Sequence, residues 1–371
     1  MAIDLNSISS ETLRSMLAQR QPVTVLDVRP SAERAEWAIP GSLHVDVYER
    51  LRAGDRSVLD DVDLPEGHRV ITVCAAGRTS LIAADLLRER GVDAISLAGG
   101  MKSWSLAWNT AEVNVPGSAA QVLQVRRTGK GCLSYIVGSA GEALVIDASL
   151  DPDVYTALAA ERGWTITAAL DTHVHADHLS RSRLLAEHTG ATLYMPAQDR
   201  VHFPFHPLRD GDTLTFGGST LQALATPGHT NESTSYLLDG QALFTGDTLF
   251  LAGVGRPDLE ATAGESRQRA AALHGSLRRL LRLPPDTMVL PGHVSEPVPF
   301  DGQPLSAPLS SVRERVALLR EDEDGFVTAI LGRIPPTPPN HHVIVQANES
   351  GLLPDGDVTD LEAGANRCAV S

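Results

Sequence analysis

A short segment at residues 172–178 reads THVHADH and follows an apolar run that is typical of a buried strand. It offers four metal-binding side chains, those of His173, His175, Asp177 and His178. Imidazole and carboxylate ligands suit zinc, iron or nickel better than magnesium or calcium. We expect the backbone to turn sharply here so that His173 and His175 can reach one ion. The segment therefore predicts a metal site on a loop at a strand end.

Four further elements place a potential ligand just after a predicted strand. They are Ile146-Asp147, Thr226-Pro227-Gly228-His229-Thr230, Phe244-Thr245-Gly246-Asp247 and Leu290-Pro291-Gly292-His293. Three of the four set the ligand beside a glycine, which lets a turning backbone approach a metal closely. Strand ends also hold ligands rigidly. The joint pattern therefore predicts one shared metal centre rather than scattered surface histidines.

A second reactive element lies in the first part of the chain, where Cys74 follows an apolar strand run and begins a loop that opens into a predicted helix. A thiol at a helix N-terminus lies near unpaired backbone N–H groups and the positive end of the helix dipole, which lower its pKa. The same N–H groups could hold a persulfide or the oxyanion of a sulfur donor. A lone cysteine at a strand end is more often an inert core residue, so the role of Cys74 depends on its context.

The elements that must position these side chains form two patterns. Residues 1–112 alternate short apolar runs with helical patterns, which predicts a parallel sheet flanked by helices. Residues 113–120 have no sustained apolar period and predict a linker. Residues 121–371 mix paired strands with helical patterns, which predicts sheets covered by helices. We interpret the Pro- and Gly-rich stretch from Pro335, with a possible helix at 343–348, as a tail packed on this second domain.

Composition excludes several classes of protein. Hydrophobic residues make up 42% of the 371 residues, charged residues make up 21%, and the formal net charge is −15. Phosphate binding normally needs a concentrated basic face, so we expect no nucleic-acid partner. Residues 1–14 lack the long apolar core of a secretory signal, and we expect no membrane partner. The three cysteines, Cys74, Cys132 and Cys368, are too far apart to form a disulfide framework, so we expect a cytoplasmic protein.

The first 112 residues resemble a single rhodanese domain, a sulfurtransferase. The resemblance rests on elements that occur in the family's order, Val25-Leu26-Asp27-Val28-Arg29, Ile39-Pro40-Gly41, the Cys74 loop, and Leu97-Ala98-Gly99-Gly100 with Trp104. It implies that Cys74 carries the sulfane sulfur and that a backbone cradle is formed by Ala75, Ala76, Gly77, Arg78 and Thr79. Two positions depart from the family, because Trp37-Ala38 replaces the common Gly-His and Thr79 replaces the commoner Arg.

Residues 121–299 resemble the metallo-β-lactamase superfamily on the ligand motifs described above. The resemblance implies an αβ/βα sandwich with metals at one edge. It implies one metal position lined by His173, His175 and His229. A second position would be lined by Asp177, His178 and His293, with Asp247 able to bridge the two. Most members are hydrolases that use zinc to activate water.

Three features resemble one branch of that superfamily, the persulfide dioxygenases. They are the His175-Ala176-Asp177-His178-Leu179-Ser180 version of the motif, the element Gly255-Arg256-Pro257-Asp258-Leu259, and a rhodanese domain in the same chain. The branch uses one Fe(II) per chain, held by two His and one Asp. By resemblance these ligands would be His173, His229 and Asp247, and the other metal-binding residues, His175, Asp177, His178 and His293, would orient them or mark a second-metal position. Arg256 would bind a glutathione carboxylate, and Asp258 and Thr230 would hold the rest of the glutathione molecule.

The branch resemblance implies oxidation of glutathione persulfide with O₂ to sulfite and glutathione. Cys74 would couple this reaction to sulfur transfer between thiosulfate or sulfite and thiols. All seven residues that could hold two metals are present, so a glyoxalase II-like thioester hydrolase with one or two Zn stays open as the alternative. A third hypothesis is a non-catalytic sulfur carrier or sensor. The sequence leaves the direction of sulfur transfer and a homodimer open.

Four further residues that could bind a metal lie outside these motifs. Cys132 lies on a predicted strand and is interpreted as a packing residue, and Cys368 is assigned no role. His341 and His342 follow Pro338-Pro339-Asn340 and are predicted to lie at the surface, although such a loop could reach the metal site.

Overall fold

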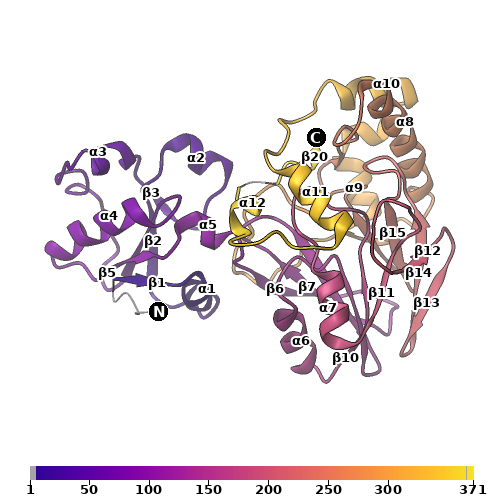
Figure 1. The fold of residues 1–371 in the computed structure, drawn as a ribbon, viewed down its shortest axis with the longest axis horizontal. Helices are drawn as coiled ribbons and strands as arrows, with labels where there is room; N and C mark the ends of the chain where they lie inside the picture. The colour runs from indigo at the N-terminus through magenta and orange to yellow at the C-terminus, as the bar shows by residue number, and fades with distance from the viewer. Residues whose placement is uncertain (1–5, 365) are drawn as a thin grey trace.

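The computed structural model describes residues 6–364 and 366–371, so the predicted domain start at Met1 lies outside the described residues. Figure 1 shows a smaller lobe, in indigo and violet, beside a larger lobe that holds the rest of the chain. The fold class predicted from the sequence is confirmed, because the first lobe is a parallel sheet with helices and the second is a sandwich of two sheets with helices outside. Within the described part of the chain, none of the helices combines the length and apolar character needed to span a bilayer.

The smaller lobe is built on a five-stranded parallel sheet in the order β1-β5-β4-β2-β3. Its elements are β1 (Ser7–Ile8), α1 (Ser10–Ala18), β2 (Val23–Asp27), α2 (Ser31–Glu36), β3 (Leu43–His44), α3 (Tyr48–Arg52), β4 (Arg69–Val73), α4 (Arg78–Glu89), β5 (Ala94–Leu97) and α5 (Gly100–Trp104). Apolar clusters cover both faces of the sheet, one around Leu26 and Val70 and the other around Ile71 and Trp104. Burial on both faces explains why its strands are continuous apolar runs.

The first sheet of the larger lobe has seven strands in the order β12-β11-β10-β9-β8-β7-β6. The strands are β6 (Asn109–Val113), β7 (Gln121–Arg126), β8 (Leu133–Ser139), β9 (Glu142–Ile146), β10 (Thr165–Leu170), β11 (Thr192–Pro196) and β12 (His206–Leu208), with helices α6 (Pro152–Ala160) and α7 (Ser182–Thr189). The edge strand β6 differs from the predicted boundaries, which placed residues 109–112 in the first domain and Val113 in the linker. Five residues of β6 pair antiparallel with β7, and this pairing draws the segment into the larger lobe.

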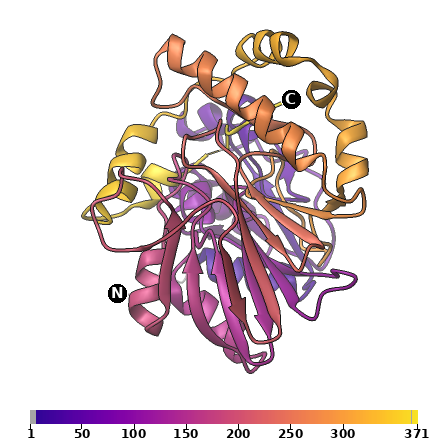
Figure 2. The same cartoon turned by 90° about the vertical axis from the view of Figure 1, so that its right-hand side faces the viewer.

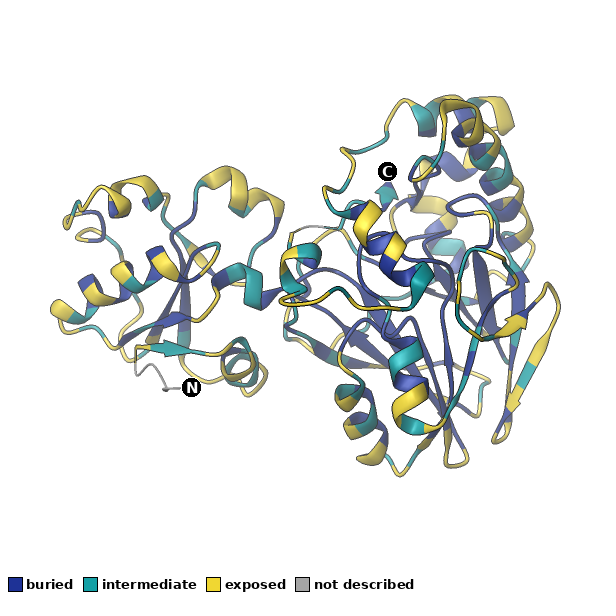
Figure 3. Ribbon diagram, viewed as in Figure 1, coloured by how far each residue is buried: buried dark blue, intermediate teal, exposed yellow. Residues whose placement is uncertain are grey.

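The second sheet has six strands in the order β13-β14-β15-β16-β18-β19. The elements here are β13 (Thr213–Phe216), β14 (Ser219–Ala225), β15 (Thr234–Leu238), β16 (Ala242–Gly246), β17 (Val254–Gly255), α8 (Ala263–Leu280), β18 (Met288–Pro291), β19 (Ala307–Pro308), α9 (Leu309–Arg315), η1 (Ala317–Arg320) and α10 (Glu323–Leu331). Figure 2 shows the orange helix α8 lying outside these strands. Figure 3 shows the same organisation by burial, with dark blue strands inside and yellow residues on the outer helices.

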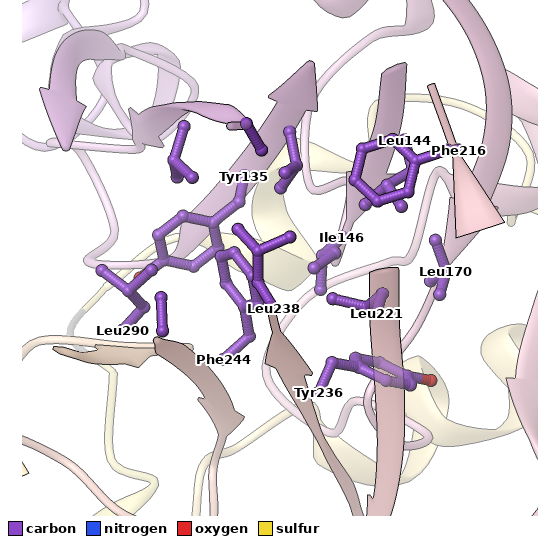
Figure 4. Packing of buried hydrophobic residues seen from close by; sticks show 14 of the residues in the cluster. Tyr135, Leu144, Ile146, Leu170, Phe216, Leu221, Tyr236, Leu238, Phe244 and Leu290 are labelled. Carbon is purple, nitrogen blue, oxygen red and sulfur yellow. The ribbon is translucent and has the colours of Figure 1, made fainter. Parts of the chain in front are cut away.

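The main core lies between the two sheets of the larger lobe. Figure 4 shows apolar side chains from both sheets meeting there, with the Tyr135 ring edge-on to Phe244 at a centroid distance of 4.9 Å. Such edge-to-face pairs add a modest stabilisation to the burial of the rings themselves. The core fixes the two sheets against each other and therefore fixes the strand ends that carry the metal-binding motifs.

The C-terminal tail crosses the larger lobe and returns to the junction between the lobes (Figure 1, yellow). It consists of α11 (His341–Ser350), α12 (Thr359–Glu362) and β20 (Ala369–Val370), which pairs with β17. The helix predicted near residues 343–348 is confirmed as part of α11. From α12, Asp360 forms an ion pair at 2.6 Å with Lys102 of α5, so the tail also contacts the smaller lobe.

The two lobes pack closely through Trp37 and the loop 127–132. Trp37 is 3% exposed and donates its Nε1 hydrogen to the carbonyl of Thr128 at 3.0 Å. Gly129 approaches the other lobe so closely that a Cβ there would lie 1.8 Å from the Trp104 carbonyl oxygen, which only glycine avoids. Trp37, one of the two departures from the rhodanese pattern, therefore serves the contact with the larger lobe.

Candidate metal centre

The predicted metal-binding loop follows β10 at the edge of the sandwich. The Thr172 N–H donates to Asp147 Oδ1 at 2.7 Å, and Asp147 itself has a left-handed φ of 55°, which is unusual outside glycine. From the second sheet, Gly246 comes so close that a Cβ there would lie 2.5 Å from Thr172 Oγ1. The expectation that glycine permits this close approach is met at Gly246. Together these contacts produce the sharp turn that the spacing of the ligands requires.

Three donor atoms converge where the sequence predicted the iron ligands. Asp247 Oδ2 lies 3.9 Å from His173 Nε2 and 3.7 Å from His229 Nε2, and all three side chains are buried. Neither His173 Nε2 nor Asp247 Oδ2 has a hydrogen-bond partner among the described residues. Buried polar atoms without partners are costly, and their convergence fits a metal ion held by two imidazoles and one carboxylate.

Neighbouring groups orient each of these ligands. The backbone carbonyl of Arg256 accepts a hydrogen bond from His229 Nδ1 at 2.8 Å, which leaves the Nε2 lone pair facing the centre. Asp247 Oδ1 accepts from His293 Nδ1 at 2.5 Å, which leaves Oδ2 as the free oxygen. Such outer contacts fix tautomer and orientation in metal sites.

Burial and neighbouring charges shift the pKa values of the three ligands. Burial lowers the pKa of His173 well below its ordinary value, and the neighbouring His175 lowers it further. Burial also lowers the pKa of His229, although Asp247 opposes this effect. For Asp247, burial raises the pKa, but the His293 charge and hydrogen bond outweigh burial and lower it overall. These shifts favour neutral imidazoles and an ionised carboxylate, the forms that bind a metal.

The residues predicted for a second metal position, Asp177, His178 and His293, contact one another, and with Cys132 they form a group whose ligand atoms all lie within 4.8 Å of one another. His293 Nε2 lies 2.8 Å from Asp177 Oδ2 in an ion-pair contact, and His178 Nδ1 lies 3.0 Å from Asp177 Oδ1. Burial lowers the pKa of His293, but Asp177 and Asp247 raise it well above its ordinary value. His293 therefore sits between two carboxylates, while His175 Nδ1 and His178 Nε2 remain buried without partners among the described residues.

Two cysteines belong to the centre, although the sequence analysis assigned neither to it. Cys132 Sγ lies 3.5 Å from Asp177 Oδ2 and 3.8 Å from His178 Nδ1, so its interpretation as a packing residue is incomplete. Burial and Asp177 raise the pKa of the Cys132 thiol, but His178 and His293 outweigh them and lower it to about 7. Cys368 Sγ lies within 4.8 Å of ligand atoms of Asp247 and His293. A single cysteine in a strand or a tail carries no spacing signal that could have revealed this.

The tail supplies further residues that sequence reasoning missed. Asn348 donates to the carbonyls of His175 and His178 at 2.8 and 2.9 Å, and Asn366 donates to Asp177 at 2.9 Å. Glu362 is fully buried and accepts from the Leu179 N–H, and it also pairs with two arginines, Arg127 and Arg181. The tail therefore holds the metal-binding loop from outside.

The predicted substrate contact of Arg256 is corrected by the structure. Its guanidinium is fully buried and forms a bidentate pair with Asp258 at 2.8 Å for both bonds. The remaining donors bind the carbonyls of Pro336 and Arg367 at 3.2 Å. Asp258 and the tail thus accept hydrogen bonds from four of the five N–H groups of the Arg256 side chain. Thr230 is also buried, and its hydroxyl lies 2.7 Å from Ser233 Oγ.

The Cys74 loop lies in the smaller lobe at the start of α4. Cys74 Sγ accepts hydrogen bonds from the N–H and hydroxyl of Ser80, both at 3.3 Å. Gly77 has a φ of 81°, and a Cβ there would lie 2.7 Å from the Gly99 nitrogen. A cavity of about 320 Å³ adjoins the thiol and is lined by Tyr48, Arg52, Cys74, Ala75, Ala76, Arg78 and Thr79. Every lining residue belongs to the smaller lobe.

Two protein families match separate parts of the chain. Residues 127–293 match the metallo-β-lactamase superfamily, and residues 9–107 match the rhodanese-like domain. Hydroxyacylglutathione hydrolase of Methylobacillus flagellatus is 40% identical over 155 residues, which cover 41% of this chain and 58% of that protein. The same enzyme of Brucella anthropi is 38% identical over 154 residues, 40% of this chain and 56% of that protein. The chain thus spans less than two thirds of these relatives.

Two solved structures are also similar. A metallo-β-lactamase from Staphylococcus aureus subsp. aureus COL is 29% identical with a TM-score of 0.58, and the match covers 64% of this chain and 74% of that one. ETHE1 from Myxococcus xanthus is 31% identical with a TM-score of 0.54, and the match covers 62% of this chain and 97% of that one.

Proposed function

Because the chain belongs to the metallo-β-lactamase superfamily and carries a rhodanese-like domain before its metal centre, we propose that it is a persulfide dioxygenase with an attached sulfurtransferase domain. In this proposal glutathione persulfide reacts with O₂ and water to give sulfite and glutathione. The outer sulfur gains three oxygen atoms, two from O₂ and one from water. O₂ takes up the four electrons that this sulfur loses.

The observation that carries the proposal is a set of converging ligand atoms at the buried centre. His173 Nε2, His229 Nε2 and Asp247 Oδ2 are the two-histidine, one-carboxylate set that suits non-haem Fe(II) with open positions. Asp247 Oδ1 is taken by His293, so this carboxylate offers one oxygen to one ion. Bound Fe(II) would supply the activation of O₂. The protein's part is to hold the ligands in fixed positions, which the burial of all three side chains supports.

The similarity to ETHE1 supports the same assignment, because the match extends over 97% of that chain. The hydroxyacylglutathione hydrolases favour the alternative, a zinc thioester hydrolase. In that case a second ion would use Asp177, His178 and His293, which with Cys132 form a second group of possible ligands. Both candidates act on a glutathione derivative, so the metal and the need for O₂ distinguish them.

The first prediction concerns the metal and O₂. The full chain, purified without air from cells supplied with iron, is expected to contain about one iron per chain and to consume O₂ when glutathione persulfide is added. Metal analysis and an oxygen electrode provide the measurements, with S-lactoylglutathione as the control substrate. A protein that retains two zinc ions, turns over S-lactoylglutathione and consumes no O₂ would contradict the proposal and establish the hydrolase.

We also propose that a small thiol carries sulfur between the two sites. The cavity at Cys74 is lined only by the smaller lobe, whereas the metal ligands lie in the larger one. Thiosulfate would transfer its sulfane sulfur to the Cys74 thiolate and release sulfite. Glutathione thiolate would then take that sulfur and leave as glutathione persulfide, the substrate of the metal centre. The reverse sequence, which forms thiosulfate from sulfite, uses the same groups.

Replacement of Cys74 by serine separates the two activities. Cys74→Ser is expected to abolish thiosulfate sulfurtransferase activity, because the hydroxyl is a far weaker nucleophile than the thiolate. Oxidation of supplied glutathione persulfide should stay within about twofold of wild type, since the metal ligands are untouched. Cys132→Ser provides a comparison in which a buried thiol of the metal centre is changed instead. Loss of both activities in a Cys74→Ser protein with unchanged circular dichroism would overturn the small-thiol route in favour of direct transfer.

A further inference from the structure

A second cluster of possible metal ligands lies outside the centre described above. It consists of Glu260, His341 and His342, whose ligand atoms all lie within 4.8 Å of one another. His341 Nε2 is 3.2 Å from Glu260 Oε1, and His342 Nδ1 contacts the same oxygen. The sequence analysis predicted both histidines at the surface, but His341 is only 8% exposed because α11 packs it against the lobe.

The cluster is organised before any ion binds. His341 Nδ1 contacts the Pro338 carbonyl at 2.9 Å, and as a donor there it directs the Nε2 lone pair toward Glu260. The two imidazole rings lie with centroids 3.9 Å apart and planes tilted by 37°, and His341 Nε2 and His342 Nδ1 both contact Glu260 Oε1. The side chains of His342 and Glu260 are 68% and 31% exposed, which leaves room for water to complete a coordination shell.

We propose that Glu260, His341 and His342 bind one divalent transition-metal ion of the zinc class, at a site separate from the catalytic centre. Two imidazole nitrogens and one carboxylate oxygen form a donor set that Zn²⁺ takes readily, with water in the fourth position. Magnesium and calcium prefer sites made mainly of oxygen ligands, so they fit this cluster less well. The assignment does not depend on which reaction the catalytic centre performs.

The location of this site gives the ion a structural role. Leu259, beside Glu260, packs with Val174 and Ala176 of the metal-binding loop and with Val345 of α11. One turn further along α11, Asn348 holds the carbonyls of His175 and His178. An ion shared by Glu260 and the start of α11 would therefore join the two segments that cover the catalytic loop and hold the tail in place (Figure 1).

The test uses the full chain with iron already in its catalytic centre, kept without air, and Zn²⁺ as the probe. Titration calorimetry is expected to show one added Zn²⁺ per chain, and Zn²⁺ is expected to raise the melting temperature. His342→Ala and Glu260→Gln should each weaken this binding at least about tenfold and remove the shift in melting temperature. The matched control is His188→Ala, which removes an exposed histidine that faces Asp153 at 3.5 Å, and it should bind Zn²⁺ as wild type does.

A third variant tests whether a loss of Zn²⁺ binding arises from a folding defect. Glu260 has a φ of 53°, a conformation that glycine adopts freely, so Glu260→Gly removes the ligand while it suits the backbone. Loss of Zn²⁺ binding in this folded variant supports the proposal. Unchanged affinity and stoichiometry in His342→Ala and Glu260→Gln would overturn it. Release of one iron for each Zn²⁺ bound would also overturn it, because the probe would then occupy the catalytic centre.

Discussion

Replacement of Asp247 by alanine is expected to abolish iron retention and to reduce O₂ uptake about a thousandfold or more. Asp247 supplies the only carboxylate of the converging set, and the change also removes the hydrogen-bond partner of His293 Nδ1. Sulfur loading of Cys74 should remain at the wild-type level, because that thiol and its cavity belong to the smaller lobe. Metal analysis after desalting, an oxygen electrode and a thiosulfate assay measure the three outcomes.

Two comparisons make the Asp247 experiment decisive. Asp199→Ala changes an exposed aspartate of the same lobe and should leave all three measurements unchanged. Asp247→Asn keeps the size of the side chain and tests whether the loss arises from charge and ligation rather than from packing. An Asp247→Ala protein that still holds iron and consumes O₂ would refute the ligand assignment. If the wild-type protein never consumes O₂ yet loads Cys74, the sulfur-carrier hypothesis takes its place.

Replacement of Glu362 by glutamine is expected to lower the free energy of unfolding by about 3–5 kcal/mol. The carboxylate is fully buried and lies between Arg127 and Arg181, with Arg181 Nη2 at 2.9 Å and Arg127 Nη2 at 3.2 Å. Glutamine keeps the shape but leaves two buried guanidinium groups without a counter-charge. Denaturant unfolding, monitored by circular dichroism, measures the loss. Because Glu362 also holds the Leu179 N–H, weaker metal retention should accompany it.

The same residue gives the stability a defined pH dependence. Burial raises the pKa of Glu362, but the charges of Arg127 and Arg181 and their hydrogen bonds outweigh burial and lower it below the ordinary 4.5. Because the folded pKa is depressed, the stabilisation is complete above pH 4.5 and is lost as the pH falls toward the folded value. Below pH 4.5 the free energy of unfolding of the wild type should therefore fall toward that of Glu362→Gln, which lacks this stabilisation already at neutral pH.

A matched change at the surface checks that interpretation. Glu187→Gln breaks an exposed ion pair with Arg183 on α7, and such pairs contribute little to stability. This variant should unfold like wild type at neutral pH and keep the acid dependence. Equal losses of unfolding free energy in Glu187→Gln and Glu362→Gln would contradict the prediction that the buried cluster stabilises the fold more than an exposed ion pair does.

The sequence revealed those parts of the centre that depend on local pattern. Ligands such as His173 and Asp247 stand directly after apolar strand runs and beside recognisable turns, and strand ends of one sheet edge meet in space. Cys132, Asn348 and Glu362 could not be found in this way, because each contacts the segment 172–179 from a position many residues away along the chain. Glu362, for example, binds the N–H of a residue 183 positions earlier.

Two further differences have the same physical origin. Strand β6 has little apolar pattern of its own and becomes a strand because β7 offers an edge with which it can pair. Arg256 looked free to bind a substrate because its sequence neighbours show nothing of the tail, whose carbonyls at Pro336 and Arg367 take its donors. In both cases the partner is distant in sequence, so local propensity carries no information about it.

The close contact between the lobes links the structure of one to that of the other. The loop 127–132 meets Trp37 and Trp104 of the smaller lobe at Thr128 and Gly129, and it ends at Cys132 beside Asp177. A substitution that moves Trp37 would therefore also disturb the loop that carries Cys132. We expect that exchange of either lobe for that of a relative requires these contact residues to be exchanged with it.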